Sequence, residues 1–167
     1  MIRLIGSLVL VLGLSLGALV SEVRVSAADE PAPSAAALSF VQRTGLDKNF
    51  VQLLAKFGAM TKTVQSLIAE RGLEAVTEVY RAQVNGAVSR YGDEWAANLA
   101  RIYGAEFTPE EMESLVTERD QSPHFAHMVA FRDTAGRRMR ETSKDLMEKA
   151  LFEVVKGTAE HFATPGK

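Results

Sequence analysis

The sequence contains no cysteine, which excludes disulfide bonds, thiolate nucleophiles and thiolate metal sites. Proline is also scarce: none occurs between Pro33 and Pro109, or between Pro123 and Pro165. Because proline interrupts helices, these stretches favour helical structure. The charges nearly cancel, with 19 lysines and arginines against 21 aspartates and glutamates. A slightly acidic chain lacks the positive surface that nucleic-acid binding requires, so we expect no nucleic-acid partner.

Motifs of the common enzyme classes are missing as well. The only Gly-x-Ser-x-Gly match in the sequence, residues 13–17, lies inside an uninterrupted hydrophobic run and not at a strand-to-helix turn, and there is no phosphate-binding loop, no dinucleotide-binding fingerprint and no His-Glu-x-x-His zinc motif. We therefore expect neither an enzymatic activity nor a cofactor.

One long hydrophobic run is present, at the start of the chain. Residues 4–20 are uncharged and follow Arg3, and the polar segment after them ends in Ala27 and Ala28. This arrangement is typical of a secretory signal peptide, and we expect cleavage after Ala28 or Ala27. The other interpretation is an uncleaved membrane anchor, because residues 4–20 just reach the roughly 17 residues that a membrane-spanning helix needs.

The composition predicts four segments. Residues 1–28 are the expected signal peptide, 29–34 a flexible mature N-terminus, 35–162 a helical domain and 163–167 a disordered tail. No later stretch is hydrophobic enough to cross a bilayer. We expect a periplasmic or secreted protein with no integral membrane domain after cleavage.

The spacing of apolar residues is helical throughout the predicted domain. Phe50, Leu53, Leu54 and Phe57, for example, follow the i, i+3, i+4, i+7 pattern. Sustained strand-type alternation is absent. We predict an all-α, single-domain bundle of about six or seven helices, at residues 35–43, 47–57, 60–71, 74–91, 94–106, 109–121 and 123–162.

Several helix ends are legible in the sequence. Thr108 can cap a helix that has Pro109 in its first position, and Glu111 can return to the cap amide. Ser122 and Pro123 repeat the arrangement of a capping residue followed by proline.

Other predicted ends depend on glycine and aspartate. Gly45 and Gly72 stand where left-handed C-caps belong, and Asp47 fits a capped helix start. Gly92 and Asp93 predict a boundary between two helices, with Asp93 as the cap.

The last predicted helix is too long for a compact domain. As one helix, residues 123–162 would extend about 60 Å, whereas a domain of this size is roughly 40 Å across. The segment either breaks near Gly136 or projects and packs against a partner. Alternatively, Gly136 stays helical and lets another helix approach closely.

A block in the second half of the chain resembles a known family. The matching residues are Tyr103, Phe-Thr-Pro-Glu-Glu-Met at 107–112 and Ser-Pro at 122–123. The block is similar to that of an exported bacterial family catalogued only as domain of unknown function 2059. Arg-Asp at 119–120 and Phe125 depart from the family's Phe-Tyr and Gly. The resemblance implies an exported α-helical fold and no assigned reaction.

His124, His127 and Asp120 are the candidate metal ligands. Their spacing would place two imidazoles and a carboxylate on one helix face, a ligand set suited to zinc or copper. However, Ser122-Pro123 separates Asp120 from the histidines. We therefore expect no metal site, and a metal-dependent enzyme is the least favoured function.

Four residues are candidates for ligand binding: Arg132, Tyr91, Trp95 and Tyr103. The helical period from Phe125 places Arg132 in an apolar stripe, where its guanidinium either is buried and paired with a carboxylate, a helix end or an anion, or reaches the surface along its apolar stem. The aromatic residues lie on two consecutive predicted helices and either line a pocket for an apolar ligand or belong to the core.

A run of basic residues follows on the outer face of the same predicted helix. It comprises Arg137, Arg138, Arg140 and Lys144, and it could contact an acidic partner or anionic lipid. Acidic residues at helical spacing, Glu141, Asp145 and Glu148, favour instead a solvated face with internal charge balance.

Together these patterns predict an exported interaction or structural module of the bacterial envelope, acting through a protein partner or through self-association. The alternative is a carrier of a small apolar or amphipathic ligand in a pocket between helices.

Overall fold

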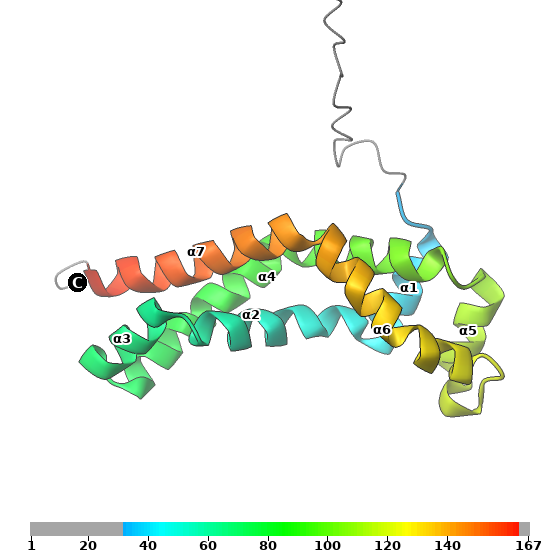
Figure 1. The fold of residues 1–167 in the computed structure, drawn as a ribbon, viewed down its shortest axis with the longest axis horizontal. Helices are drawn as coiled ribbons and strands as arrows, with labels where there is room; N and C mark the ends of the chain where they lie inside the picture. Colours follow the sequence, from blue (N-terminus) through cyan, green and yellow to red (C-terminus); the bar gives the residue numbers. More distant parts are fainter. Residues whose placement is uncertain (1–31, 164–167) are drawn as a thin grey trace, which may run out of the picture. The chain divides into compact units, whose positions relative to one another are not determined.

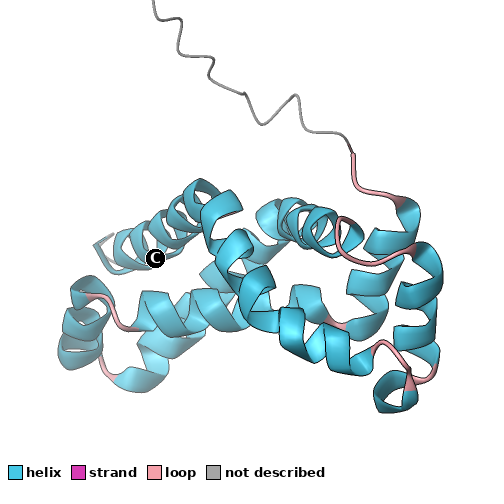
Figure 2. Ribbon diagram, turned by 45° about the vertical axis from the view of Figure 1, so that its right-hand side comes forward, coloured by secondary structure: helices cyan, strands magenta, loops and turns pink. Residues whose placement is uncertain are grey.

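The computed structural model describes residues 32–163, so the predicted signal peptide and the end of the predicted tail lie outside the described residues. The described part contains only helices and short loops, with no strand (Figures 1 and 2). This confirms the predicted all-α multi-helix bundle. The elements are α1 (Ala35–Thr44), η2 (Leu46–Lys48), α2 (Asn49–Ala59), α3 (Lys62–Arg71), α4 (Leu73–Gly104), α5 (Pro109–Thr117), η3 (Arg119–Gln121), α6 (Phe125–Thr142) and α7 (Lys144–Ala163).

Helix α4 is the central element of the bundle. It runs without interruption for 32 residues, so the predicted boundary at Gly92-Asp93 is wrong. Glycine in a helix interior costs only about 1 kcal/mol relative to alanine. The buried residues on both sides of Gly92, such as Ala87, Trp95 and Leu99, outweigh that cost by packing into the core.

Helix α7 lies antiparallel along α4 (Figure 1). Ser143, just before α7, contacts Asn98, and Gly157 lies against Gln83 nearer the start of α4. The other side of α7 packs against α2 and α3. Its buried residues, Leu146, Ala150, Val154 and Thr158, therefore lie among three helices.

Helices α1 and α6 pack against the second half of α4, where an aromatic cluster joins the three helices, and α5 packs against α1. The Tyr103 ring lies 5.5 Å from Phe40 of α1 and 5.7 Å from Phe131 of α6, measured between ring centroids. Phe107 lies 5.8 Å from Phe131 in an edge-to-face arrangement. Such pairs add about 0.5–1.5 kcal/mol beyond simple burial.

The predicted 123–162 helix divides in two, but not at Gly136. The division falls at Ser143, between α6 and α7. A Cβ atom at Gly136 would meet only the end of the Arg140 side chain, 3.8 Å away. No other helix approaches closely there, so both roles predicted for Gly136 are wrong.

The predicted helix ends show mixed outcomes. Gly45 adopts the expected left-handed conformation, with φ 71°, after α1. Gly72 ends α3 with φ 89° and ψ 151°, which lies outside the left-handed helical region, so the left-handed cap predicted there is wrong. Asp47 does not cap α2: it lies within η2, and Lys48 precedes α2 without a side-chain cap.

None of the helices in the described range combines the length and hydrophobicity that crossing a membrane would require.

Candidate functional site

The outer surface of α6 is the candidate site, and its position follows from how α6 is anchored. Phe131, Ala135 and Met139 are buried and face the rest of the bundle. The buried stripe of α6 therefore runs through Phe131, and Arg132, one position later, lies outside it. Arg132 is exposed, so the interpretation in which it is buried and paired is wrong.

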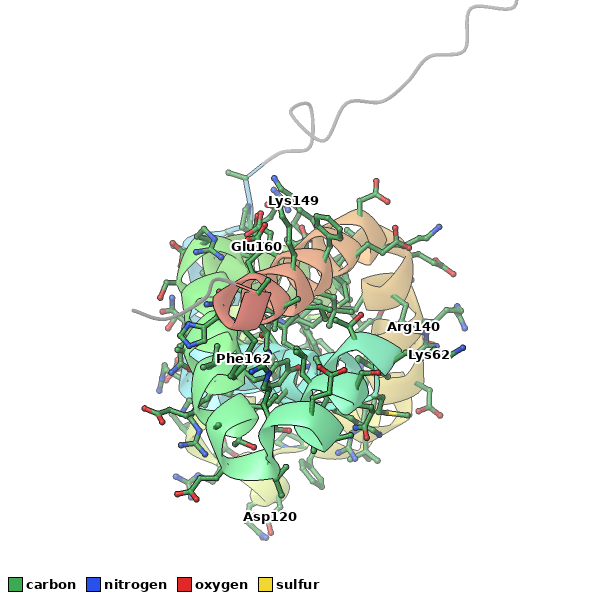
Figure 3. All side chains as sticks on the ribbon, turned by 90° about the vertical axis from the view of Figure 1, so that its left-hand side faces the viewer. Lys62, Asp120, Arg140, Lys149, Glu160 and Phe162 are labelled. Atoms are coloured by element: carbon green, nitrogen blue, oxygen red, sulfur yellow. The ribbon has the colours of Figure 1, made fainter. Side chains whose placement is uncertain are left out.

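The exposed side of α6 carries more arginines than carboxylates, which are Asp133 and Glu141. Arg132, Arg137, Arg138 and Arg140 are all exposed, and none forms an ion pair with a residue of the described range. The Arg138 guanidinium lies over the Phe131 ring, 5.5 Å from its centroid. Figure 3 shows Arg140 projecting from the side of the bundle.

The expected charge balance along this face is only partly present. Lys144 does pair with Glu148, at 3.9 Å, as helical spacing predicts. Arg137 and Arg140, in contrast, form no ion pair with Glu141 or another described residue. Charged groups without partners are available to an oppositely charged surface without first breaking an internal pair.

An apolar patch precedes the arginines on the same outer face. Val129 is 43 % exposed, and Ala126 and Ala130 beside it are exposed as well. Residues 126, 129, 130, 137 and 140 fall within one side of a helix with 3.6 residues per turn. We call this set of five residues the α6 face.

The basic residues outside α6 provide a useful contrast. Arg43 forms two hydrogen bonds to Glu113 of α5. Arg90 of α4 donates to Glu153 of α7 at 3.0 Å. These arginines join helices to one another, whereas those of the α6 face point to solvent.

The three aromatic ligand candidates have structural roles and do not converge on one cavity. The Trp95 indole N–H donates to Asn49 at 2.8 Å, and its ring stacks on Phe50. Tyr103 belongs to the aromatic cluster, and burial raises the pKa of its phenol, while the nearby Arg132 charge acts against this rise. Both residues are buried in the core.

Tyr91 connects α4 to α7. Its hydroxyl donates to Glu153 at 2.5 Å, and this hydrogen bond raises the pKa of Tyr91 and lowers the pKa of Glu153. Lys149 and Arg90 lie over the Tyr91 ring, within 6 Å of its centroid.

An open hollow of about 390 Å³ lies between the start of α4 and the end of α7. Val79, Gln83 and Phe162 are among its lining residues. None of the predicted ligand-binding residues borders this hollow, which no sequence pattern had indicated.

The candidate metal ligands are held apart by two separate contacts. His124 Nδ1 lies 3.3 Å from Glu111, and His127 Nε2 lies 3.0 Å from Glu106. Asp120 is exposed on η3, in the turn that precedes α6. Among the described residues, no group of three possible ligands is placed to hold a metal ion.

Of the two predicted caps, the one at Thr108 is confirmed, whereas the one at Ser122-Pro123 is wrong: α6 begins at Phe125, and the residue before it, His124, forms no side-chain cap. Thr108 and Glu111 form the complete capping box: the Glu111 N–H donates to Thr108 at 3.3 Å, and the Thr108 N–H donates to Glu111 at 2.8 Å. This backbone contact is the main reason that the pKa of Glu111 is lowered, and His124 adds to it. Ser122, beside Pro123, accepts a hydrogen bond from the His124 N–H at 3.2 Å.

Sequence reasoning missed a buried polar network where α6 meets α7. The Asn98 side chain donates to the Ser143 hydroxyl at 2.9 Å, and Ser143 donates to the Met139 sulfur at 3.4 Å. Asn98 accepts a hydrogen bond from Arg101 at 2.8 Å. An asparagine in the middle of a helical pattern carries no sign of such a contact, because its partner is 45 residues away.

Comparisons with models of known protein families, with curated proteins and with solved structures find no match to this chain. The resemblance to an exported family of unknown function therefore stays a prediction.

Proposed function

We propose that this protein is an exported helical interaction module of the bacterial envelope, and that it contacts an acidic partner protein through the α6 face. The observation that carries this proposal is the pair Arg137 and Arg140, exposed and without an ion pair in the described range, on the same side of α6 as the exposed Val129.

The chemistry of the α6 face suits a protein partner. Interfaces are enriched in arginine, whose planar guanidinium binds carboxylates in a bidentate manner. Val129 and its neighbouring alanines supply a small apolar area that a partner could cover. Opposite charges across such a contact increase the association rate and the specificity more than the affinity.

Export is supported by the sequence alone. The apolar run at residues 4–20 and the small residues Ala27 and Ala28 predict a cleaved signal peptide. Fractionation of the native host, followed by mass measurement, tests this part independently. A mature chain beginning at Asp29 in the periplasm or medium agrees with the proposal, and an uncleaved cytoplasmic chain contradicts it.

The contact itself is tested by a photo-crosslinking residue at position 129 in the native host. We expect an envelope protein to be crosslinked, and the product to be lost in an Arg137→Glu/Arg140→Glu variant. The matched control is Lys62→Glu/Arg81→Glu, which changes the net charge equally on α3 and α4, at exposed positions. The same crosslinks in both double variants would show that the α6 face is not the docking surface.

A further inference from the structure

The bend between α6 and α7 is not imposed by the local sequence. Its single residue, Ser143, has φ −105° and ψ 17° and is flanked by Thr142 and Lys144, so neither glycine nor proline interrupts the helix. Helical hydrogen bonds continue on both sides: the Ser143 N–H donates to Met139 O at 2.9 Å, and the Met147 N–H donates to Ser143 O at 2.9 Å. Residues 125–163 are therefore able to form one continuous helix.

The bend is held instead by a contact from another helix. Ser143 is 1 % exposed and accepts a hydrogen bond from Asn98, which is 6 % exposed. The Arg101 guanidinium donates a hydrogen bond to the side-chain oxygen of Asn98. Because buried amides and hydroxyls need partners, this network stabilises the bent form relative to a straight one.

Straightening would remove α7 from its place on α2, α3 and α4. A continuous helix over residues 125–163 is about 58 Å long, so its second half would leave the bundle. Leu146, Ala150, Val154 and Thr158 would then be exposed, together with the surface of α4 that they cover. The surface complementary to this opened site is the α7 of a second copy.

We infer that α7 is an exchangeable element, and that the Asn98–Ser143 hydrogen bond selects between two states. In one state α7 folds back on its own chain. In the other, α6 and α7 are continuous and two copies exchange α7. Each α7 then makes in the partner the contacts that it makes here, so the exchange preserves the core. This inference goes beyond the proposed function and does not depend on the α6 face.

Two substitutions at Ser143 distinguish the exchange of α7 from the mere loss of the Asn98–Ser143 hydrogen bond. Ser143→Ala and Ser143→Gly both remove the hydroxyl, but alanine favours a continuous helix about fivefold more than glycine. With two hinges per exchanged dimer, we expect the dimerisation constant of Ser143→Ala to exceed that of Ser143→Gly about twentyfold. Light scattering coupled to size-exclusion chromatography, after equilibration at high concentration, gives both values.

Thr142→Ala is the matched control. Thr142 is exposed and already helical at the end of α6, so this change raises helix propensity equally in both states. We expect its dimerisation constant to equal that of the unaltered protein. Equal dimerisation of Ser143→Ala and Ser143→Gly would overturn the inference.

A crosslink between different chains tests the exchange directly, and the absence of native cysteine makes it specific. One chain carries Arg90→Cys and the other Glu153→Cys, at positions whose side chains meet across α4 and α7. After the two chains are mixed in the Ser143→Ala background, a short bis-maleimide, which adds to one cysteine thiol at each end, links them only if α7 has been exchanged. The same mixture of cysteine variants with Ser143 unaltered measures the exchange when the residue between α6 and α7 is not substituted. Dimers that yield no interchain product would refute the inference.

Discussion

Helices α6 and α7 follow one another with one residue between them, yet they differ in how many neighbouring helices cover them. α7 lies among α2, α3 and α4 and buries four residues, Leu146, Ala150, Val154 and Thr158. α6 packs mainly against the second half of α4, and its buried residues are Phe131, Ala135 and Met139. The charged residues differ as well: Glu153 of α7 is joined to α4, whereas the arginines of the α6 face point outward.

The difference shows that an amphipathic pattern fixes which side of a helix is buried but not how many neighbours cover it. A helix covered by several neighbours tolerates little change in side-chain volume. A helix that packs along only one stripe keeps most of its surface available for contacts with other molecules. Substitutions at matched positions of α6 and α7 test this contrast.

The largest effect is expected for Phe131→Ala. Phe131 joins α6 to Tyr103 and Phe107, and replacement of a buried phenylalanine by alanine costs about 3–5 kcal/mol. Urea denaturation should show this loss in the free energy of unfolding. Val129→Ala, on the outer side of the same helix, should change it by less than about 0.5 kcal/mol. Equal effects of the two substitutions would mean that α6 is not anchored by its inner stripe.

The second largest effect on stability is expected when leucine replaces a buried alanine of α7, compared with the same change at an exposed alanine of α6. Ala150 of α7 is fully buried, so Ala150→Leu should destabilise the protein by about 1–3 kcal/mol through overpacking. Ala130 of α6 is exposed, and Ala130→Leu should stay within about 0.5 kcal/mol of the parent. Thermal unfolding monitored by circular dichroism compares the pair. A tolerant Ala150 would show that α7 is packed as loosely as α6.

Much of the fold could be predicted because helices are local. The apolar period gave the all-α class, and the box of Thr108 and Glu111 gave the start of α5. The predicted break at Gly92 failed because the weak helix propensity of one glycine is outweighed by packing along α4. The break at Ser143 was missed because Asn98, which holds it, comes from another helix.

The candidate site was only partly predictable. The basic run containing Arg137 and Arg140 was visible, but its charge balance depends on side-chain geometry that spacing alone does not fix. Arg132 was assigned to the buried stripe because the phase was counted from Phe125, and a shift of one residue turns a helix by about 100°. The roles of Trp95 and Tyr103 depend on partners distant in sequence, Asn49 and Phe40.

Acidification should loosen the attachment of α7. The hydrogen bond from Tyr91, and next the one from Arg90, hold the pKa of Glu153 below its ordinary value of 4.5. A carboxyl with a lowered pKa in the folded state contributes stability above its unfolded pKa, and this contribution is lost as the pH falls through the folded pKa. We therefore expect the free energy of unfolding to decrease below about pH 4.5.

Glu153→Gln removes this titration, so its stability should fall less steeply with pH than that of the parent. The difference should be small because the pair is partly exposed to solvent. Urea denaturation at neutral pH and near pH 3.5 measures both slopes, and Glu111 and Glu113, whose pKa values are also lowered, continue to titrate in both proteins. Identical slopes would show that Glu153 does not stabilise the contact of α4 with α7.

The smallest effect on stability is expected where the proposed function is located. Arg137→Gln/Arg140→Gln removes two charges that form no ion pair in the described range, so the free energy of unfolding should change by less than about 0.5 kcal/mol. Glutamine keeps the helix propensity close to that of arginine, so the backbone of α6 is not weakened. Differential scanning calorimetry at low and high salt measures the change. A large loss of stability at low salt would mean that these arginines serve the fold, and the case for the α6 face as a binding surface would then fail.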